Sequence, residues 1–219
     1  MSEKLFDCGL SLHDKIAKGV DTLADNVATT YGPRGRNVII HRNGSTPIIT
    51  KDGVTVAKFV NLTDPVENTA AEIIKQAAAK TATDAGDGTT TATILARAMF
   101  LQARKYITTG ASPVEIKRGM DKAVAAILEK LSEISRPIQS EEEIANVATI
   151  SSNGDKTIGK LISRAVDLAG KDGSVSIEEA RSVETSLDII EGFRFDSGWL
   201  SPKFITDQRR NAVSYENPL

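Results

Sequence analysis

The sequence predicts a mainly α-helical first domain that carries one β-hairpin, followed by a mixed region of helices and strands. Apolar side chains recur at helical spacing in several segments before about residue 135. Asn43-Gly44 separates two short β-rich runs, a combination that is typical of a hairpin. Beyond Arg136-Pro137, β-rich runs become frequent.

The first element is expected to be a helix over residues 11–31. Its apolar residues share one face, at spacings of four, three and four: Ile16, Val20, Leu23 and Val27. Gly32-Pro33 should end this helix, because proline cannot continue it and glycine suits a C-terminal cap. Residues 37–41 and 47–50 are the expected hairpin strands, and Asp52-Gly53 is expected to be a second turn.

Three helices should follow the hairpin. The first opens at Asp64-Pro65 and runs to about residue 83, and the second spans about residues 89–108. The third opens at residues 112–115, whose Ser-Pro-Val-Glu sequence is typical of a capping box with proline at the first helical position. Its apolar residues should line one face: Ile116, Met120, Ala123, Ile127 and Leu131.

The remaining elements define two further regions. Residues 140–143 repeat the capping pattern, and residues 155–169 form a helix with a predicted inner stripe. That stripe consists of Ile158, Leu161, Ala165 and Leu168. Residues 174–178, 187–193 and 212–215 have the composition of strands. We place domain boundaries near Arg136-Pro137 and near Glu191-Gly192.

The bulk composition narrows the function classes. Lys and Arg number 27 and Asp and Glu 29, so the net charge of −2 gives no support for nucleic-acid binding. With a single cysteine, Cys8, and two histidines, His13 and His41, a zinc site is not expected. The N-terminus has no signal-peptide pattern, and no segment approaches the ~20 apolar residues that span a bilayer. We expect a cytoplasmic protein with no membrane partner.

The third of three glycine-containing loops, residues 86–91, carries the strongest chemical signal. Its sequence is Gly-Asp-Gly-Thr-Thr-Thr, and a helix follows. Glycines allow close backbone approach to a ligand, and the N–H groups that open a helix attract phosphate. A carboxylate at such a site needs a cation, so Asp87 is predicted to bind Mg²⁺ and the threonines to contact phosphate. A plain helix N-cap is the alternative interpretation.

Two other loops are candidates for the same phosphate. The first loop, residues 30–37, follows a helix and contains two glycines. In the second loop, residues 50–53, Lys51 would neutralise phosphate and Asp52 would orient a water molecule. Taken alone, each is more simply a turn or a polar hairpin exit.

The motifs in these loops and beyond them resemble group I chaperonins, the GroEL and 60-kDa heat-shock protein family. The resemblance runs from about Gly9 to Phe204, and the Gly-Asp-Gly-Thr-Thr-Thr-Ala-Thr string at residues 86–93 is highly specific to chaperonins. Further matching segments are residues 31–38, 49–54, 117–119, 148–153 and 191–205.

The resemblance implies a chaperonin fold with three domains. Residues 1–135 would belong to a mainly α equatorial ATP-binding domain with a β-hairpin. Residues 136–190 would belong to an α+β intermediate hinge domain, and residues 191–219 would begin an α/β apical domain that binds unfolded proteins. Family members work as rings of identical subunits, some with a lid co-chaperonin, and the hairpin at residues 37–50 resembles their inter-subunit contact.

The resemblance also implies roles for individual residues. ATP would be lined by the first-loop residues Thr30, Tyr31, Gly32 and Pro33. Lys51 would lie by the phosphates, and the third loop would cradle them through Gly88, Thr89, Thr90 and Thr91. Asp87 would hold Mg²⁺, Asp52 would be the catalytic residue that helps to place the attacking water, and K⁺ is implied near Thr30 and Lys51.

The sequence departs from the family pattern in three respects. Trp199 and Phe204 keep the aromatic character of the substrate-binding face, but Lys203 stands where a tyrosine is usual. Ser197 stands where an arginine is usual, which puts an interdomain ion pair in doubt. Family chains are also more than twice as long, so this sequence corresponds to their N-terminal portion.

Three functions follow, of which an ATP-driven folding machine is favoured. A truncated chaperonin-like binding or assembly module without ATP turnover is the alternative that the length suggests. A small-molecule kinase with a glycine-rich loop is the third, and it leaves residues 191–219 unexplained.

Overall fold

The computed structural model describes residues 7–42, 44–170, 173–177, 185–189, 198 and 200–215. The chain forms two compact units, Met1–Pro137 and Ile138–Leu219. Within the described residues the helices are α1 (Gly9–Ala28), α2 (Gly53–Phe59), α3 (Pro65–Ala85), α4 (Thr89–Thr108), α5 (Pro113–Ile134), α6 (Glu141–Ser151) and α7 (Lys156–Ala169), and the strands are β1 (Val38–Ile40) and β2 (Ile48–Thr50). The helix and hairpin predictions for the first unit are therefore confirmed to within a few residues, apart from α2.

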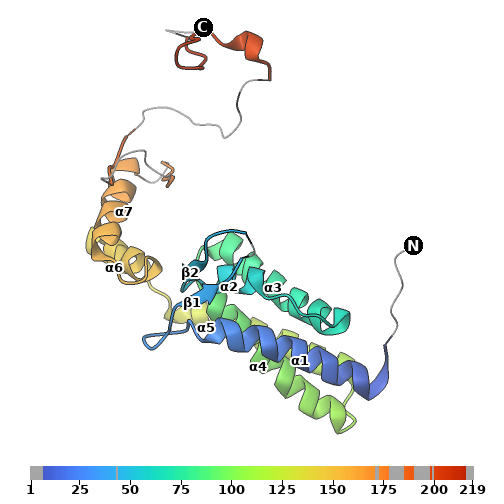
Figure 1. Ribbon diagram of the computed structural model, residues 1–219. Coiled ribbons are helices and arrows are strands. Elements are labelled where there is room, and N and C mark those ends of the chain that lie inside the picture. The colour runs from blue at the N-terminus through green and yellow to red at the C-terminus, as the bar shows by residue number, and fades with distance from the viewer. Residues whose placement is uncertain are drawn as a thin grey trace. The chain divides into compact units, whose positions relative to one another are not determined.

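The core of the first unit lies between α1, α2 and α3, with α4 packed against α1 and α3 (Figure 1). The expected stripe of α1 supplies its centre, since Val20, Leu23 and Val27 are buried. Small residues let the helices approach one another. A Cβ built on Gly19 would lie 2.1 Å from the backbone oxygen of Glu67, so α1 and α3 touch at that point.

The hairpin and the helix after it are set by local chemistry. β1 and β2 are antiparallel, with Ile39 opposite Ile49. The expected turn at Asp52-Gly53 is wrong, because these residues begin α2. The Asp52 carboxylate accepts hydrogen bonds from Val54 N and Thr55 N and thereby caps that helix. A seven-residue helix shows little apolar periodicity, which is why the sequence pattern did not reveal it.

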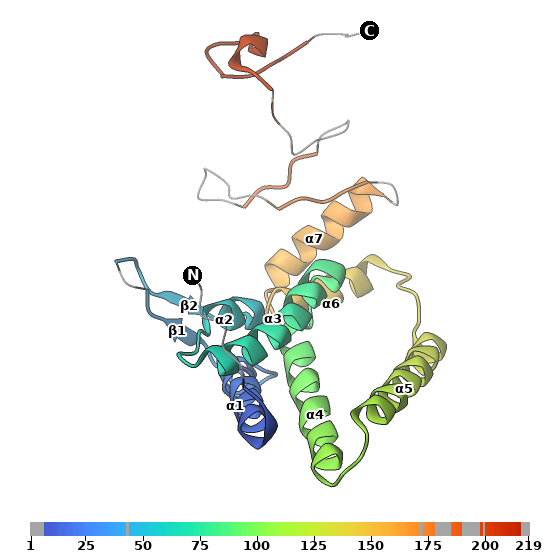
Figure 2. The same cartoon turned by 90° about the vertical axis from the view of Figure 1, so that its right-hand side faces the viewer.

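α5 forms over the predicted residues, but its expected apolar stripe packs against almost nothing in the described part of the chain. It has no buried residue, and Ile127 and Leu131 are more than half exposed. Figure 2 shows α5 turning away from α4 after the connecting loop. The helix start also differs from the capping-box prediction: Ser112 makes no side-chain capping bond within the described residues, and Glu115 pairs with Arg118 instead.

α6 and α7 pack on each other in the second unit. The two helices touch at Gly159, where a built Cβ would lie 2.1 Å from Thr149 Oγ1. The Ser163 hydroxyl donates to the backbone oxygen of Glu141 at 2.8 Å. The predicted inner stripe of α7 is therefore only partly right, since Ala165 is buried but Ile158 and Leu168 are exposed. Small residues form the buried face because the two helices lie too close for larger ones.

The strand predictions for the second unit are wrong where the structure describes them. Residues 174–177, 187–189 and 213–215 form no strand, and Ala212 makes only an isolated antiparallel bridge to Asp207. A strand needs a partner to satisfy its backbone groups, which composition alone does not supply. Residues 178 and 190–193 lie outside the described residues. In the part of the chain that is described, no helix has both the length and the apolar character to cross a membrane.

Candidate functional site

The three glycine-containing loops meet at Thr90, the second residue of α4. The Thr30 and Thr90 hydroxyl oxygens lie 3.4 Å apart, which joins the first loop to the third. A Cβ built on Gly53 would lie 2.1 Å from Thr90 Oγ1, so the second loop is in direct contact with the same side chain. Segments up to 60 residues apart in the sequence thus converge on one hydroxyl group.

The hydrogen-bond direction at this junction follows from donor counting. Thr30 is buried, and its hydroxyl donates to Val27 O at 2.8 Å. A hydroxyl group has a single hydrogen, so the Thr90 hydroxyl must donate to Thr30 Oγ1. Donor counting therefore makes Thr90 the donor in the 3.4 Å contact with Thr30.

Lys51 lies beside the first loop. A Cβ built on Gly35 would lie 2.1 Å from Thr30 O and 2.9 Å from Lys51 Cε, so the lysine side chain passes over Gly35. The first loop folds back on itself through two backbone bonds, Gly35 N to Gly32 O at 2.9 Å and Arg36 N to Thr29 O at 2.8 Å. This fold brings Thr30, Gly35 and Lys51 together.

Asp52 has a defined local role. Its Oδ2 accepts from Thr55 N at 2.8 Å and from Thr55 Oγ1 at 2.5 Å, and its Oδ1 accepts weakly from Val54 N at 3.4 Å. The side chain is exposed, and each carboxylate oxygen accepts more than one hydrogen bond. The capping bonds hold Asp52 in one orientation and leave room for it to accept a hydrogen bond from water.

The third loop turns sharply between α3 and α4. Gly86 and Gly88 adopt left-handed backbone angles, with φ of 74° and 86°, which other residues reach only with strain. Ala92 N donates the first hydrogen bond of α4, to Gly88 O at 2.9 Å. The N–H groups of residues 89–91 therefore have no partner within the helix, and they create the partial positive charge that favours anions.

The other predicted residues surround this junction. Asp87 is exposed, and its Oδ1 accepts from Gly88 N at 2.6 Å. Thr89 is buried, whereas Thr91 and Tyr31 are exposed, so the three threonines point in different directions around the helix. Gly32 has a φ of 70° and, with Pro33, is exposed at the turn after α1.

The residues present are compatible with Mg²⁺ held together with phosphate. No cluster of three or more metal-ligating side chains occurs among the described residues. Mg²⁺ in phosphate sites is commonly held by one or two carboxylates, with phosphate oxygens and water completing the shell. Asp87, just before the N-terminus of α4, fits that donor set.

Of the two predicted substrate-binding residues, Trp199 lies outside the described residues. Phe204 is 54% exposed and belongs to a short 3₁₀-helix at Pro202–Phe204. Lys203, its neighbour, is also exposed.

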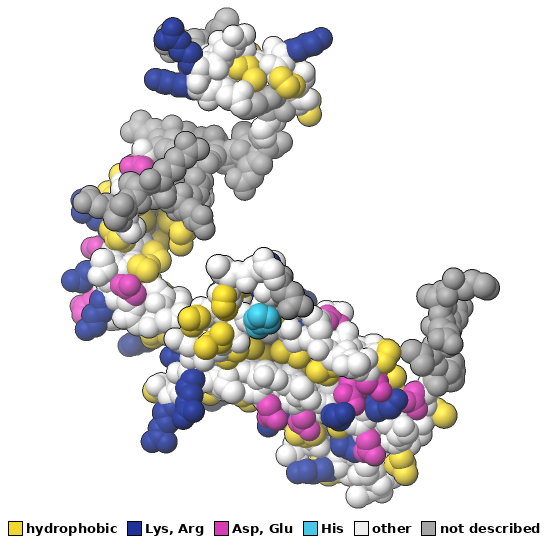
Figure 3. Space-filling model, in the orientation of Figure 1, with side chains coloured by type: hydrophobic (Ala, Val, Ile, Leu, Met, Phe, Trp, Pro, Cys, Tyr) yellow, Lys and Arg dark blue, Asp and Glu magenta, His cyan; other side chains and the backbone are white. Residues whose placement is uncertain are grey.

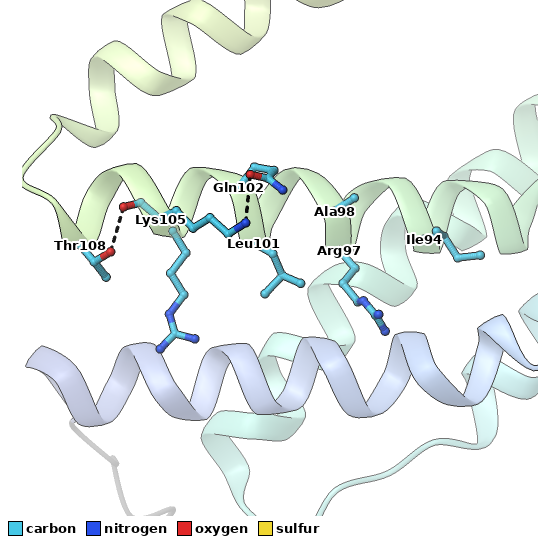
Figure 4. A pocket seen from close by; sticks show the side chains of 8 residues that line it. Ile94, Arg97, Ala98, Leu101, Gln102, Lys105 and Thr108 are labelled. Atoms are coloured by element: carbon cyan, nitrogen blue, oxygen red, sulfur yellow. Dashed lines mark hydrogen bonds between the residues drawn. The ribbon is translucent and has the colours of Figure 1, made fainter.

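A surface depression of ≈540 Å³ lies along α4 but away from the three loops (Figure 4). Its lining runs along α4 from Ile94, about one turn after Thr90, through Leu101 to Thr108. Arg97 and Arg104 from this lining pair with Asp25 and Asp14 of α1. Acidic and basic side chains gather on this part of the molecule in Figure 3. These charges hold two helices together, and we do not place the site here.

Comparison with known proteins decides the family. The model of the TCP-1/cpn60 chaperonin family matches residues 23–215. The chain belongs to the TCP-1/cpn60 chaperonin family. All three loops of this chaperonin chain lie within the matched range.

Two solved structures of chaperonins resemble the chain. A group III chaperonin in the open state has a TM-score of 0.61 and 25% identity, over 72% of this chain and 31% of its own. The chaperonin gp146 of bacteriophage EL 2 (Pseudomonas aeruginosa), solved in the presence of ATP-BeFx, has a TM-score of 0.61 and 27% identity, over 71% of this chain and 28% of its own. The chaperonin chain thus spans less than a third of the length of either protein.

Sequence reasoning missed two residues at the junction. Gly53 was predicted to lie in a turn, and no contact with another loop was predicted for Gly35. Neither glycine has a left-handed φ. Each is instead in close contact with another loop. A glycine beside Lys51 and Asp52 could have suggested close approach, but only the tertiary structure shows what approaches it.

Proposed function

We propose that this chain is the N-terminal portion of a chaperonin subunit that binds Mg²⁺-ATP and hydrolyses it to drive the folding of other proteins. The meeting of the three loops at Thr90 carries the proposal. It brings a lysine, a carboxylate and a helix N-terminus into one small region. The ATP analogue named with the gp146 structure supports nucleotide binding in this family.

The chemistry follows from the residues. The free N–H groups of residues 89–91 and the Lys51 ammonium group would bind the phosphates. Mg²⁺ held by Asp87 would neutralise phosphate charge as the terminal phosphoryl group is transferred. Asp52, fixed by its capping bonds, would orient the attacking water. K⁺ near Thr30 and Lys51 is part of the proposal.

The proposal includes an assignment of the chain to three domains. We assign residues 1–135 to the equatorial domain, 136–190 to the hinge and 191–219 to the start of the apical domain. Identical subunits would form a ring in the cytoplasm, with the edges of the hairpin pairing with a neighbour and a lid co-chaperonin closing the cavity. Trp199 and Phe204 would contact unfolded proteins. The group I subtype rests on the sequence motifs, because the two solved structures come from other chaperonins.

The proposal is tested by ATP turnover of the full-length protein carrying Asp87→Lys. Replacing the metal ligand with a cation should lower kcat by about 100-fold or more. Asp167→Lys is the matched control, because it makes the same charge change at an exposed position of α7. Normal turnover by the Asp87 variant would show that the site is wrongly assigned.

The second candidate function is a chaperonin-like binding or assembly module without ATP turnover; the chain spans less than a third of the matched chaperonins. A short chaperonin-like chain would join or compete with rings through its hairpin and would not turn over ATP. Calorimetric titration of residues 1–219 with ATP distinguishes the two. Tight binding that requires Mg²⁺ contradicts this second function.

A further inference from the structure

We propose that Gly53 and Gly35 are positioning residues of the nucleotide site: their missing side chains let the second loop lie directly between the other two. This inference rests on the proposed function, because it concerns how Lys51 and Asp52 are held against α4. Neither glycine is among the residues that would contact ATP.

Gly53 acts at the contact with α4. It is buried, and a Cβ there would lie 2.1 Å from Thr90 Oγ1 and 3.2 Å from both Thr90 N and Thr90 Cβ. The backbone of Gly53 is not left-handed, so alanine can adopt its conformation. The lack of room for a Cβ is therefore the local reason for glycine at position 53. As the first residue of α2, alanine would even favour the helix.

Gly35 acts at the contact between the first and second loops. A Cβ at this position would meet the backbone oxygen of Thr30 at 2.1 Å. A backbone atom cannot move aside as a flexible side chain can, so the first loop would shift. Lys51 Cε, 2.9 Å from the same point, would be displaced with it.

Both substitutions would change the site through one mechanism. Gly53→Ala would push the loop that carries Lys51 and Asp52 away from the start of α4. Gly35→Ala would move Thr30 and the Lys51 side chain. A displacement of about 1 Å can lower a reaction rate by about 100-fold, so these glycines should affect turnover without touching the nucleotide.

The test is a double-mutant cycle at Gly53 and Thr90 in the full-length protein, read by Mg²⁺-ATP affinity and by kcat. Gly53→Ala should weaken ATP binding by about 10-fold or more relative to the wild type. Thr90→Ala removes the oxygen that the new Cβ would strike. Adding Gly53→Ala to the Thr90→Ala protein should therefore change affinity by only about 2- to 3-fold, because the 2.1 Å clash is removed and only the two contacts at 3.2 Å remain.

Two control glycines separate positioning from general destabilisation. Gly119, on α5, has no atom within 4 Å of a built Cβ, so Gly119→Ala should leave ATP affinity unchanged. Gly19→Ala creates an equally close clash, at 2.1 Å from Glu67 O, but about 16 Å along α1 from Thr30. It should lower the melting temperature while the folded protein keeps its ATP affinity.

The outcomes are distinguishable. A wild-type protein that does not bind Mg²⁺-ATP overturns the proposed function. If the wild type binds, a Gly53→Ala protein with unchanged affinity and turnover overturns the positioning role. The positioning role is also overturned if Gly53→Ala lowers ATP affinity equally in the wild-type protein and in the Thr90→Ala protein. Should Gly53→Ala fail to fold, the Gly53→Ala/Thr90→Ala protein should regain its fold, and failure to regain it counts against the inference.

Discussion

α1 and α5 have the same kind of apolar stripe in sequence but opposite surroundings in the fold. α1 buries six residues, and Leu23 at its centre is 0% exposed. α5 buries none within the described structure, and Leu131 on its stripe is 51% exposed. Amphipathic spacing therefore identifies a helix and its apolar face, but burial depends on whether a partner element covers that face.

The ion pairs of the two helices differ in the same way. Most of those of α1 reach other elements, as in Lys18 with Glu67 of α3 and Asp25 with Arg97 of α4. The pairs described on α5 lie within the helix, such as Lys117 with Asp121 at 2.7 Å. Pairs between helices fix tertiary geometry, whereas pairs three or four residues apart support only the helix itself.

The largest expected effect is on stability, and it compares a leucine of the core with an exposed leucine of α5. In residues 1–219, Leu23→Ala should lower the free energy of unfolding by about 3 kcal/mol, because it leaves a cavity at the centre of the core. Leu131→Ala should change it by only about 0.5 kcal/mol or less, because the side chain packs against little. Urea denaturation of both variants measures the difference. Equal losses would show that α5 is covered in solution.

An intermediate effect compares helix starts. Asp155 caps α7 by accepting from Thr157 N at 2.8 Å and Ile158 N at 3.1 Å. Asp155→Ala should lower the free energy of unfolding by about 1 kcal/mol. Ser112→Ala at the start of α5 should have almost no effect, since no capping bond of Ser112 is described. If Ser112→Ala proved the more costly change in the same denaturation experiment, the described start of α5 would be wrong.

The smallest effect concerns pH. Lys15 lies 3.1 Å from Asp64, and this contact, with the N–H groups of Glu67 and Val66, lowers the pKa of the Asp64 carboxyl below its usual 3.8. A lowered pKa contributes stability above about pH 3.8 that is lost as the pH falls through the value in the folded protein. Hydrogen bonds to Asp64 and Asp7 raise the pKa of Lys15, so its contribution is present below pH 10.5 and is lost above it.

Asp64→Asn keeps a side-chain oxygen that can cap α3 but removes the negative charge. The free energy of unfolding should therefore fall less steeply as the pH is lowered. The measurement is the free energy of unfolding between pH 2 and pH 7, with the expected change below pH 3.8. Asp121→Asn on α5 is the control, because its pair with Lys117 is exposed and should contribute only about 0.3 to 0.5 kcal/mol. If Asp64→Asn lost stability at low pH as steeply as the wild type, the contribution of the Asp64 carboxylate to acid stability would be contradicted.

The three loops that make up the candidate site could be predicted from sequence. The three loops were identified because glycines, a lysine, carboxylates and threonines occur where helices and strands end. Their meeting point could not be predicted, since Thr30 and Thr90 belong to elements 60 residues apart. The donor in this contact was also missed, because it depends on what surrounds Thr30 in the fold. The helix that starts at Gly53 was missed because its seven residues show little apolar periodicity.

Local chemistry in the sequence determined where most of the helices form, where the hairpin turns and which charged residues the three loops carry. Periodicity, prolines, glycines and capping side chains act within a few residues, so they can be recognised without the fold. Only the tertiary structure decided which apolar faces are covered and which loops meet. Those outcomes depend on close packing between distant segments, where one added Cβ at Gly53 would meet Thr90 at 2.1 Å.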